Sequence, residues 1–189
     1  MAGFDPTHSV RFDLPHGSVL AGGDERHVLL PCSALDDLVL VAGTEAAVAV
    51  GRALGGAIGK RIAARLGGAG GVRGSSVENV VAEIAGELAV AGIGAASIER
   101  WGRALVVVVD RPATSDLTFL ASIVEGVLEA ASSARVWCAS LGREGTVARV
   151  LVGSEGAVAR AQALLAEGVA WGEVLARLQA QSPALRGGA

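Results

Sequence analysis

AASIERWGRALVVVVD, residues 95–110, and RVWCASLGREGTVARVLV, residues 135–152, decide the fold of this chain. Each stretch holds two apolar runs separated by turn residues, Gly102-Arg103 in the first and Gly142-Arg143-Glu144-Gly145 in the second, and this pattern predicts two β-hairpins. The run 105–109 is continuous and mostly β-branched, which favours a central strand covered on both faces or a strand with an occupied outer face. The expected strands are 95–101, 104–110, 135–141 and 146–152. Together they predict one antiparallel sheet whose apolar face must be covered by helices.

Helical periodicity predicts long helices before, between and after these hairpins. The expected helices are 44–66, 76–91, 116–132, 154–167 and 171–179. The start signals are Thr44, the capping-box sequence Ser75-Ser76-Val77-Glu78 and Ser154, and the stop signals are Gly92 and Gly168. The order helix, helix, hairpin, helix, hairpin therefore predicts an α+β fold, a four-stranded antiparallel sheet from two hairpins covered by long helices, with C-terminal helices added.

The chain is expected to divide into four parts. These are an N-terminal arm with a short strand and helix (1–42), the α+β domain (43–154), C-terminal helices packed on that domain (155–182) and a disordered tail (183–189). In the arm, residues 27–30 are a candidate edge strand, and Pro31 is followed by Ser33 and Asp36, which resemble the N-cap pair of a short helix. The glycine-rich segment 67–74 lacks a phosphate-binding pattern and is expected to be a flexible helix connection.

Composition and charge exclude several function classes. The 189 residues are 51% hydrophobic but only 3% aromatic, so the core is expected to contain small side chains and closely packed backbones. A formal net charge of −3 offers no broad attraction to nucleic acid or anionic lipid. Residues 38–58 are apolar and long enough to span a membrane. Because Glu45 and Arg52 lie within them, and a charge at the bilayer centre costs about 3 kcal/mol, a buried helix of a soluble protein is favoured. Residues 1–9 lack the features of a signal peptide, so a cytoplasmic location is expected.

A row of glycines in the first long helix is the main candidate for a functional surface. Gly51, Gly55 and Gly59 recur at every fourth residue, and each costs a helix about 1 kcal/mol relative to alanine, so a close approach of another backbone or a ligand must offset the cost. Three interpretations are open: membrane helix pairing, close packing of two soluble helices within or between subunits, and one wall of an apolar ligand pocket. The candidate ligand or helix-packing groove comprises Gly51, Gly55, Ile58, Gly59, Trp101, Val124 and Val127. Trp101 and Trp137 are expected to fill core volume rather than to form the floor of a pocket.

Titratable residues form no catalytic or metal-binding pattern, so no catalytic residue, metal or cofactor is predicted. The histidines of the arm, His8, His16 and His27, are expected to be exposed to solvent. Cys32 and Cys138 are expected to be free buried thiols, and no histidine lies near Cys138 to activate it as a nucleophile. Glu125, midway along an apolar helix, is either a buried acid with a raised pKa or, as we expect, a side chain that points outward.

The ordered set of elements resembles the superfamily that joins TRAPP vesicle-tethering subunits to bacterial 4-vinyl-reductase-like domains. The resemblance covers about residues 43 to 153. The segments that carry it are LGGAIGKRI at 54–62, VAGIG at 90–94 followed by Trp101-Gly102, the glycine-containing helix at 119–129, and VWCASLG at 136–142 with the strand 146–152.

This resemblance implies a domain that pairs through its helices and often holds an apolar pocket between helices and sheet. Members include tethering scaffolds, ligand-sensing domains of phenol-responsive transcription activators and accessory proteins of pigment biosynthesis. The zinc site of the sensing members does not carry over, because Cys138 would be flanked by Arg135 and Thr146 at ligand-like positions. The acylated cysteine of some tethering subunits is also missing, since the corresponding turn reads Gly70-Gly71-Val72-Arg73.

The sequence and the resemblance together favour a non-enzymatic interaction or small-molecule-sensing domain. It is expected to form a homodimer and to bind an apolar small molecule, a partner protein or a partner helix beside the glycine row, with no nucleic acid partner and no membrane span. One alternative is a scaffold or regulator of a small GTPase, as in TRAPP. Another is an accessory protein or enzyme of tetrapyrrole metabolism, as for the vinyl reductases.

Overall fold

The two hairpins join in one four-stranded antiparallel sheet. A computed structural model describes residues 4–7, 9–22, 25–102 and 104–180, so the expectations for His8, Arg103 and the C-terminal tail fall outside the described residues. The strands are β4 (Ala95–Trp101), β5 (Ala104–Asp110), β6 (Trp137–Glu144) and β7 (Val147–Gly153), in the order β4-β5-β7-β6. Val107 of β5 lies opposite Val150 of β7, which is where the hairpins meet. The predicted α+β class and the four-stranded antiparallel sheet from two hairpins are confirmed.

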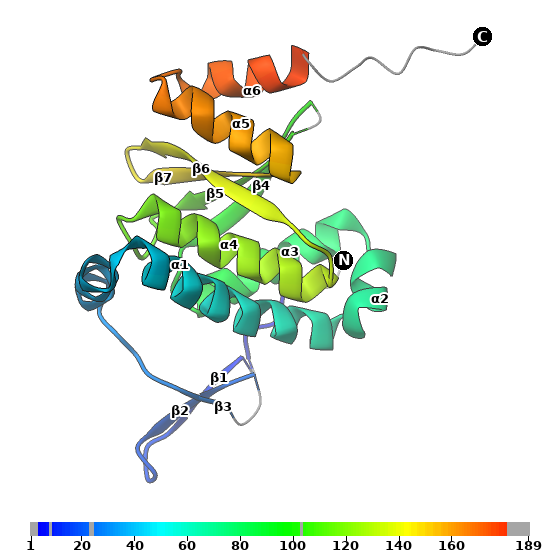
Figure 1. Cartoon of the computed structure of the whole chain (residues 1–189). Coiled ribbons are helices and arrows are strands. Elements are labelled where there is room, and N and C mark those ends of the chain that lie inside the picture. Colours follow the sequence, from blue (N-terminus) through cyan, green and yellow to red (C-terminus); the bar gives the residue numbers. More distant parts are fainter. Residues whose placement is uncertain (1–3, 8, 23–24, 103, 181–189) are drawn as a thin grey trace.

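Both faces of the central strand β5 are covered, as its run of valines predicted. Val107 and Val109 belong to a core shared with α1, α3 and α4, whereas Val106 and Val108 belong to a second core formed with α5 and α6. Figure 1 shows the resulting layers, with α5 (Glu155–Ala166) and α6 (Trp171–Ala180) on one side of the sheet and α4 with α1 on the other. The hydroxyl of Ser154 caps α5 by accepting a hydrogen bond from the Ala157 N–H, as expected.

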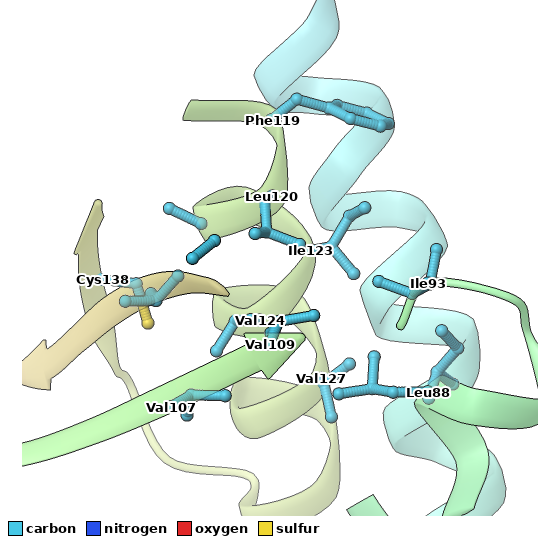
Figure 2. Packing of buried hydrophobic residues seen from close by; sticks show 14 of the residues in the cluster. Leu88, Ile93, Val107, Val109, Phe119, Leu120, Ile123, Val124, Val127 and Cys138 are labelled. Atoms are coloured by element: carbon cyan, nitrogen blue, oxygen red, sulfur yellow. The ribbon is translucent and has the colours of Figure 1, made fainter. Parts of the chain in front are cut away.

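Helix α4 (Leu117–Ser132) lies between the sheet and α1 and is the centre of the larger core. It begins where predicted, because the Asp116 carboxylate accepts hydrogen bonds of 2.8 Å from the N–H groups of Thr118 and Phe119. Since α4 has protein on both sides, its residues from 119 to 127 are all buried. Figure 2 shows Ile123 and Val127 of this helix directed toward the residues of α1 and α3.

Helix α1 (Cys32–Arg65) is two helical segments joined at Gly43, whose φ of 75° and ψ of 165° interrupt the helix. The second segment agrees with the predicted helix 44–66. The predicted cap pair of the first segment is wrong, because Asp36 accepts hydrogen bonds instead from the Thr114 hydroxyl at 2.7 Å and the Ser115 N–H at 2.9 Å. Within the described residues, α1 is the one helix whose length and apolar composition would suffice to cross a membrane.

Three connections differ from the prediction. Residues 67–74 are not a flexible link, since Gly68–Gly74 forms the short helix α2. Helix α3 (Val77–Val90) is capped by Ser76, whose hydroxyl accepts from the Asn79 N–H, so Glu78 is not the partner in a capping box. Strand β6 ends at Glu144, three residues beyond its expected end, so the second hairpin turns later than predicted. A bulge interrupts its pairing with β7 between Ser140 and Gly142.

The N-terminal arm forms a small antiparallel sheet, where one short strand was expected. Its strands are β1 (Val10–Asp13), β2 (Ser18–Ala21) and β3 (Glu25–His27), in that order. The candidate strand 27–30 is therefore wrong apart from its first residue. Strands of three or four residues, separated by a turn that contains Pro15, give too little alternation for periodicity to detect. Figure 1 shows this small sheet projecting from the side of the domain on which α1 lies.

Candidate functional site

A cavity of about 770 Å³ lies between the N-terminal arm and the outer face of α1. Its volume is within the range of ligand-binding clefts. The lining residues are Ser9, Gly22 and Glu25 from the arm, Ala53, Gly56, Ala57, Lys60, Arg61, Ala64 and Arg65 from α1, and Glu87 from α3.

Helical geometry explains why this face of α1 forms a cleft. At 100° per residue, Ala53, Ala57 and Ala64 project from the side of the helix opposite to the glycine row. Their side chains are short, and a Cβ added to Gly56 would meet no atom within 4 Å. The cleft therefore has an apolar floor of small residues along α1.

A buried ion-pair network closes one end of the cavity. Glu87 of α3 is only 1% exposed, and one of its carboxylate oxygens accepts a hydrogen bond from Arg61 Nε at 2.8 Å. Its other oxygen pairs with Arg65 Nη2. Arg65 Nε lies 3.1 Å from Glu83 Oε2, and Arg65 Nη1 donates to the buried hydroxyl of Ser9 at 3.3 Å. This network connects α1, α3 and the arm.

Sequence reasoning missed this network, although a signal was present. Both arginines, Arg61 and Arg65, lie near the C-terminal end of α1, where positive charge also favours the helix dipole. They are four residues apart, and so are Glu83 and Glu87 on the following long helix. Two arginines spaced i,i+4 on one helix and two glutamates with the same spacing on the next long helix indicate that these two helix faces meet.

One guanidinium nitrogen at the cavity lacks a hydrogen-bond acceptor. Arg61 Nη1 is buried, and among the described residues no acceptor lies within hydrogen-bonding distance of it. The nearest ion-pair partner of this nitrogen is Glu25 Oε2 of the arm, 4.0 Å away. Burial lowers the pKa of Arg61, and the charge of Glu25 partly opposes that shift. A buried donor in this state favours a ligand atom that accepts a hydrogen bond.

The glycines predicted as a groove lie on the other face of α1, against α4. A Cβ on Gly51 would collide with the Ser122 side chain, and one on Gly55 would collide with the Ile123 carbonyl. Gly126 of α4 lies in the same way against the backbone of α1. In this structure the space beside the glycine row is filled by a helix of the same chain.

Of the remaining candidate groove residues, three lie in the core beside the glycine row and Trp101 lies apart. Ile58, Val124 and Val127 are buried in the larger core. Trp101 is 40% exposed and lies beside α6, where its ring meets Trp171 edge to face with centroids 5.5 Å apart. The expectation that Trp101 fills core volume is wrong, because it is at the end of β4, where the sheet no longer covers it. Whether any residue of the set binds a ligand stays a prediction.

Glu125 points inward, so the expectation that it faces solvent is wrong. Its side chain is buried, with the residue 6% exposed, and it pairs with Arg52 of α1. The other carboxylate oxygen accepts a hydrogen bond from the Cys138 N–H at 2.8 Å. The carboxylate thus joins α1, α4 and β6.

The cysteines and histidines differ in their exposure. Cys138 is buried as expected, and burial raises its thiol pKa to about 12, assisted by the charge of Glu129. A thiol with this pKa is a poor nucleophile at neutral pH. Cys32, the first residue of α1, is exposed, contrary to expectation. His16 is exposed as expected, whereas His27 is half-buried. No group of three or more potential metal ligands occurs within the described residues.

Comparison with known proteins gives a match at the level of structure. No protein-family model and no curated protein matches the sequence. The fold is similar to a crystal structure of the phenol-responsive sensory domain of the transcription activator PoxR with phenol, with a TM-score of 0.61 and 15% sequence identity. The match covers 84% of this chain and 90% of that domain. It shows a shared fold.

Proposed function

We propose that this chain is a non-enzymatic small-molecule-sensing domain whose ligand occupies the cavity between the arm and α1. The observation that carries the proposal is the cavity itself, with its floor of small residues, the buried Nη1 of Arg61 and the buried Glu87. The shared fold with a domain that is described as phenol-responsive supports a sensing role. The buried, protonated thiol of Cys138 gives no support to nucleophilic chemistry.

The position of the cavity suggests how binding is transmitted. Ser9, Gly22 and Glu25 of the arm form one wall, so a ligand changes the free energy of holding the arm against α1. The arm continues through residues 28–30 directly into the first segment of α1. A ligand that favours one arm position therefore favours one position of that segment.

We further propose that the arm and the first segment of α1 bind a second copy of the chain. Among the described residues, all but two of the exposed large apolar side chains lie between residues 12 and 50; they are Phe12, Leu14, Val28, Leu29, Leu30, Leu38, Leu40, Val41 and Val50. This concentration of exposed apolar side chains in the arm and α1 favours an interaction surface there. Ligand binding and dimer assembly would then share the same arm.

Native mass spectrometry of freshly purified protein tests the sensing role. We expect an adduct that dissociates from the folded chain, together with an assembly of about twice the chain mass of 18.8 kDa. Light scattering with and without the extracted adduct should show a change in the monomer–dimer equilibrium. Repeated absence of an adduct, with an equilibrium that no small molecule shifts, would refute the sensing role.

A further inference from the structure

We propose that the cavity between the arm and α1 selects a monocarboxylate with an apolar body, with its carboxylate held by Arg61 and Lys60. The proposal rests on the proposed ligand cavity and adds the chemical class of its ligand. It follows from three features: the unpaired donor at Arg61, the unpaired positive charge of Lys60, and the apolar floor of small residues beside them.

The two arginines of the cavity differ in their free hydrogen-bond donors. Arg61 uses Nε for Glu87 and keeps Nη1 buried without an acceptor among the described residues. Arg65 is already engaged by Glu83, Glu87 and Ser9. Among the arginines of the lining, Arg61 therefore has the unpaired donor for a ligand. A hydrogen bond from this guanidinium to a carboxylate is stronger than one to a neutral acceptor.

The charges of the cavity lining also favour an anionic ligand. Arg61 and Arg65 are matched by the carboxylates of Glu83 and Glu87, with Glu25 at the edge. Lys60 is exposed at the cavity and has no carboxylate within ion-pairing distance in the part of the chain that the structure describes. Lys60 therefore offers an unpaired positive charge to a ligand with one negative charge.

The floor sets the shape of the rest of the ligand. Ala53, Gly56 and Ala57 extend toward the N-terminal end of α1 from the two cations. The eight-residue interval from Ala53 to Arg61 corresponds to about 12 Å along a helix axis. A chain the length of octanoate can lie along this floor with its carboxylate at Arg61.

Glu25 is the competitor that the ligand must displace. Its side chain is 58% exposed, and its carboxylate is 4.0 Å from Arg61 Nη1, so the contact is weak. A ligand carboxylate that takes the closer position releases this part of the arm. Loss of the Glu25 charge should therefore tighten binding, which a merely structural role for Glu25 would not produce.

Calorimetric titration of the full chain with sodium octanoate, compared with 1-octanol, tests the proposal. We expect saturable binding of octanoate at one site, and about tenfold weaker binding of the alcohol, which keeps the chain and lacks the charge. Glu25→Gln should tighten octanoate binding by about threefold, and Lys60→Gln should weaken it by about as much.

A cavity-filling variant locates the site. Gly56→Leu places a side chain in the open space above the floor and should weaken octanoate binding by about tenfold or more. Gly156→Leu is the matched control, because Gly156 of α5 also has open space around its Cβ position and lies outside the cavity lining. Its affinity should equal that of the wild type. Melting curves for each variant show that the fold is intact.

The outcomes separate this inference from the sensing role. Equal affinity for octanol and octanoate, no octanoate binding, or unchanged binding in Gly56→Leu would overturn the carboxylate assignment. If a neutral adduct copurifies and shifts the dimer equilibrium, the sensing role stands and the carboxylate class is wrong. If octanoate binds as expected but leaves the equilibrium unchanged, the ligand class stands and the sensing role fails.

Discussion

Gly55 of α1 lies directly against the main-chain carbonyl of Ile123 in α4. A Cβ at Gly55 would overlap that oxygen, and one at Gly59 would overlap the carbonyl of Val127. The residue numbers of the contacted positions in α4 increase along the chain as those of α1 do, so α1 and α4 run parallel where they meet. The helix-weakening cost of the glycines is offset by backbone contact between two long helices.

Alanine at Gly55 and at its neighbour Gly56 should have opposite effects. Gly55→Ala forces α1 away from α4 and should lower the free energy of unfolding by about 1–3 kcal/mol. Gly56→Ala is the matched control in the same helix, where the added methyl group meets open space and should raise that free energy by up to about 1 kcal/mol. Urea unfolding followed by circular dichroism measures both changes. Equal effects of the two substitutions would show that this helix contact is absent in solution.

The buried carboxylate of Glu125 should be important for stability. Glu125→Ala leaves the Cys138 N–H without an acceptor and should cost about 1–3 kcal/mol of unfolding free energy. Glu125→Gln keeps an acceptor oxygen and should cost less. Glu173→Ala is the control, because its exposed pair with Arg177 contributes only about 0.5 kcal/mol. Thermal unfolding that ranks Glu173→Ala as the most harmful of the three would contradict the inward position of Glu125.

The two thiols should react at very different rates. At about pH 8, an alkylating reagent should modify exposed Cys32 in the native protein and leave Cys138 intact until the chain is unfolded. Peptide mass mapping before and after unfolding identifies the modified residue. Rapid native modification of Cys138 would contradict its burial.

The same thiol predicts a dependence of stability on alkaline pH. The pKa of Cys138 is raised from 9.0 to about 12, so the folded state holds its proton where the unfolded chain releases it. The stabilising contribution is complete below the unfolded pKa and is lost progressively as pH rises from about 9 toward about 12. Over this range the unfolding free energy of the wild type should fall more steeply than that of Cys138→Ala. Parallel curves for the two proteins would show that Cys138 is ionised freely in the fold.

A charge on the exposed side of α1 should prevent dimer formation. Leu40 and Val41 are 80% and 86% exposed, so Val41→Lys should leave the folded monomer intact and reduce the mass measured by light scattering toward that of one chain. Val77→Lys is the control, because Val77 is equally apolar and exposed but lies on α3, outside the arm and the first segment of α1. Loss of the dimer in both variants, or in neither, would refute this surface as the interface.

Several features could be predicted because their signals are local. The strands β4 and β5 have the predicted bounds, and Ser154 caps α5 where expected. Glu125 could not be placed in this way, because α4 is buried on both sides and its sequence does not show which neighbour meets each face. The cavity was also missed, since its walls come from the arm, α1 and α3, which are far apart in the sequence.

From residue 76 onward the sequence by itself determined the helices and strands and their order, because turns, caps and apolar periodicity act within a few residues. Only the tertiary structure decided that the glycines of α1 face α4, that Arg61 and Glu87 meet, and that the arm covers the opposite face of the helix. These choices depend on contacts between distant segments, and a stripe of small residues or a charge on a helix is compatible with more than one partner.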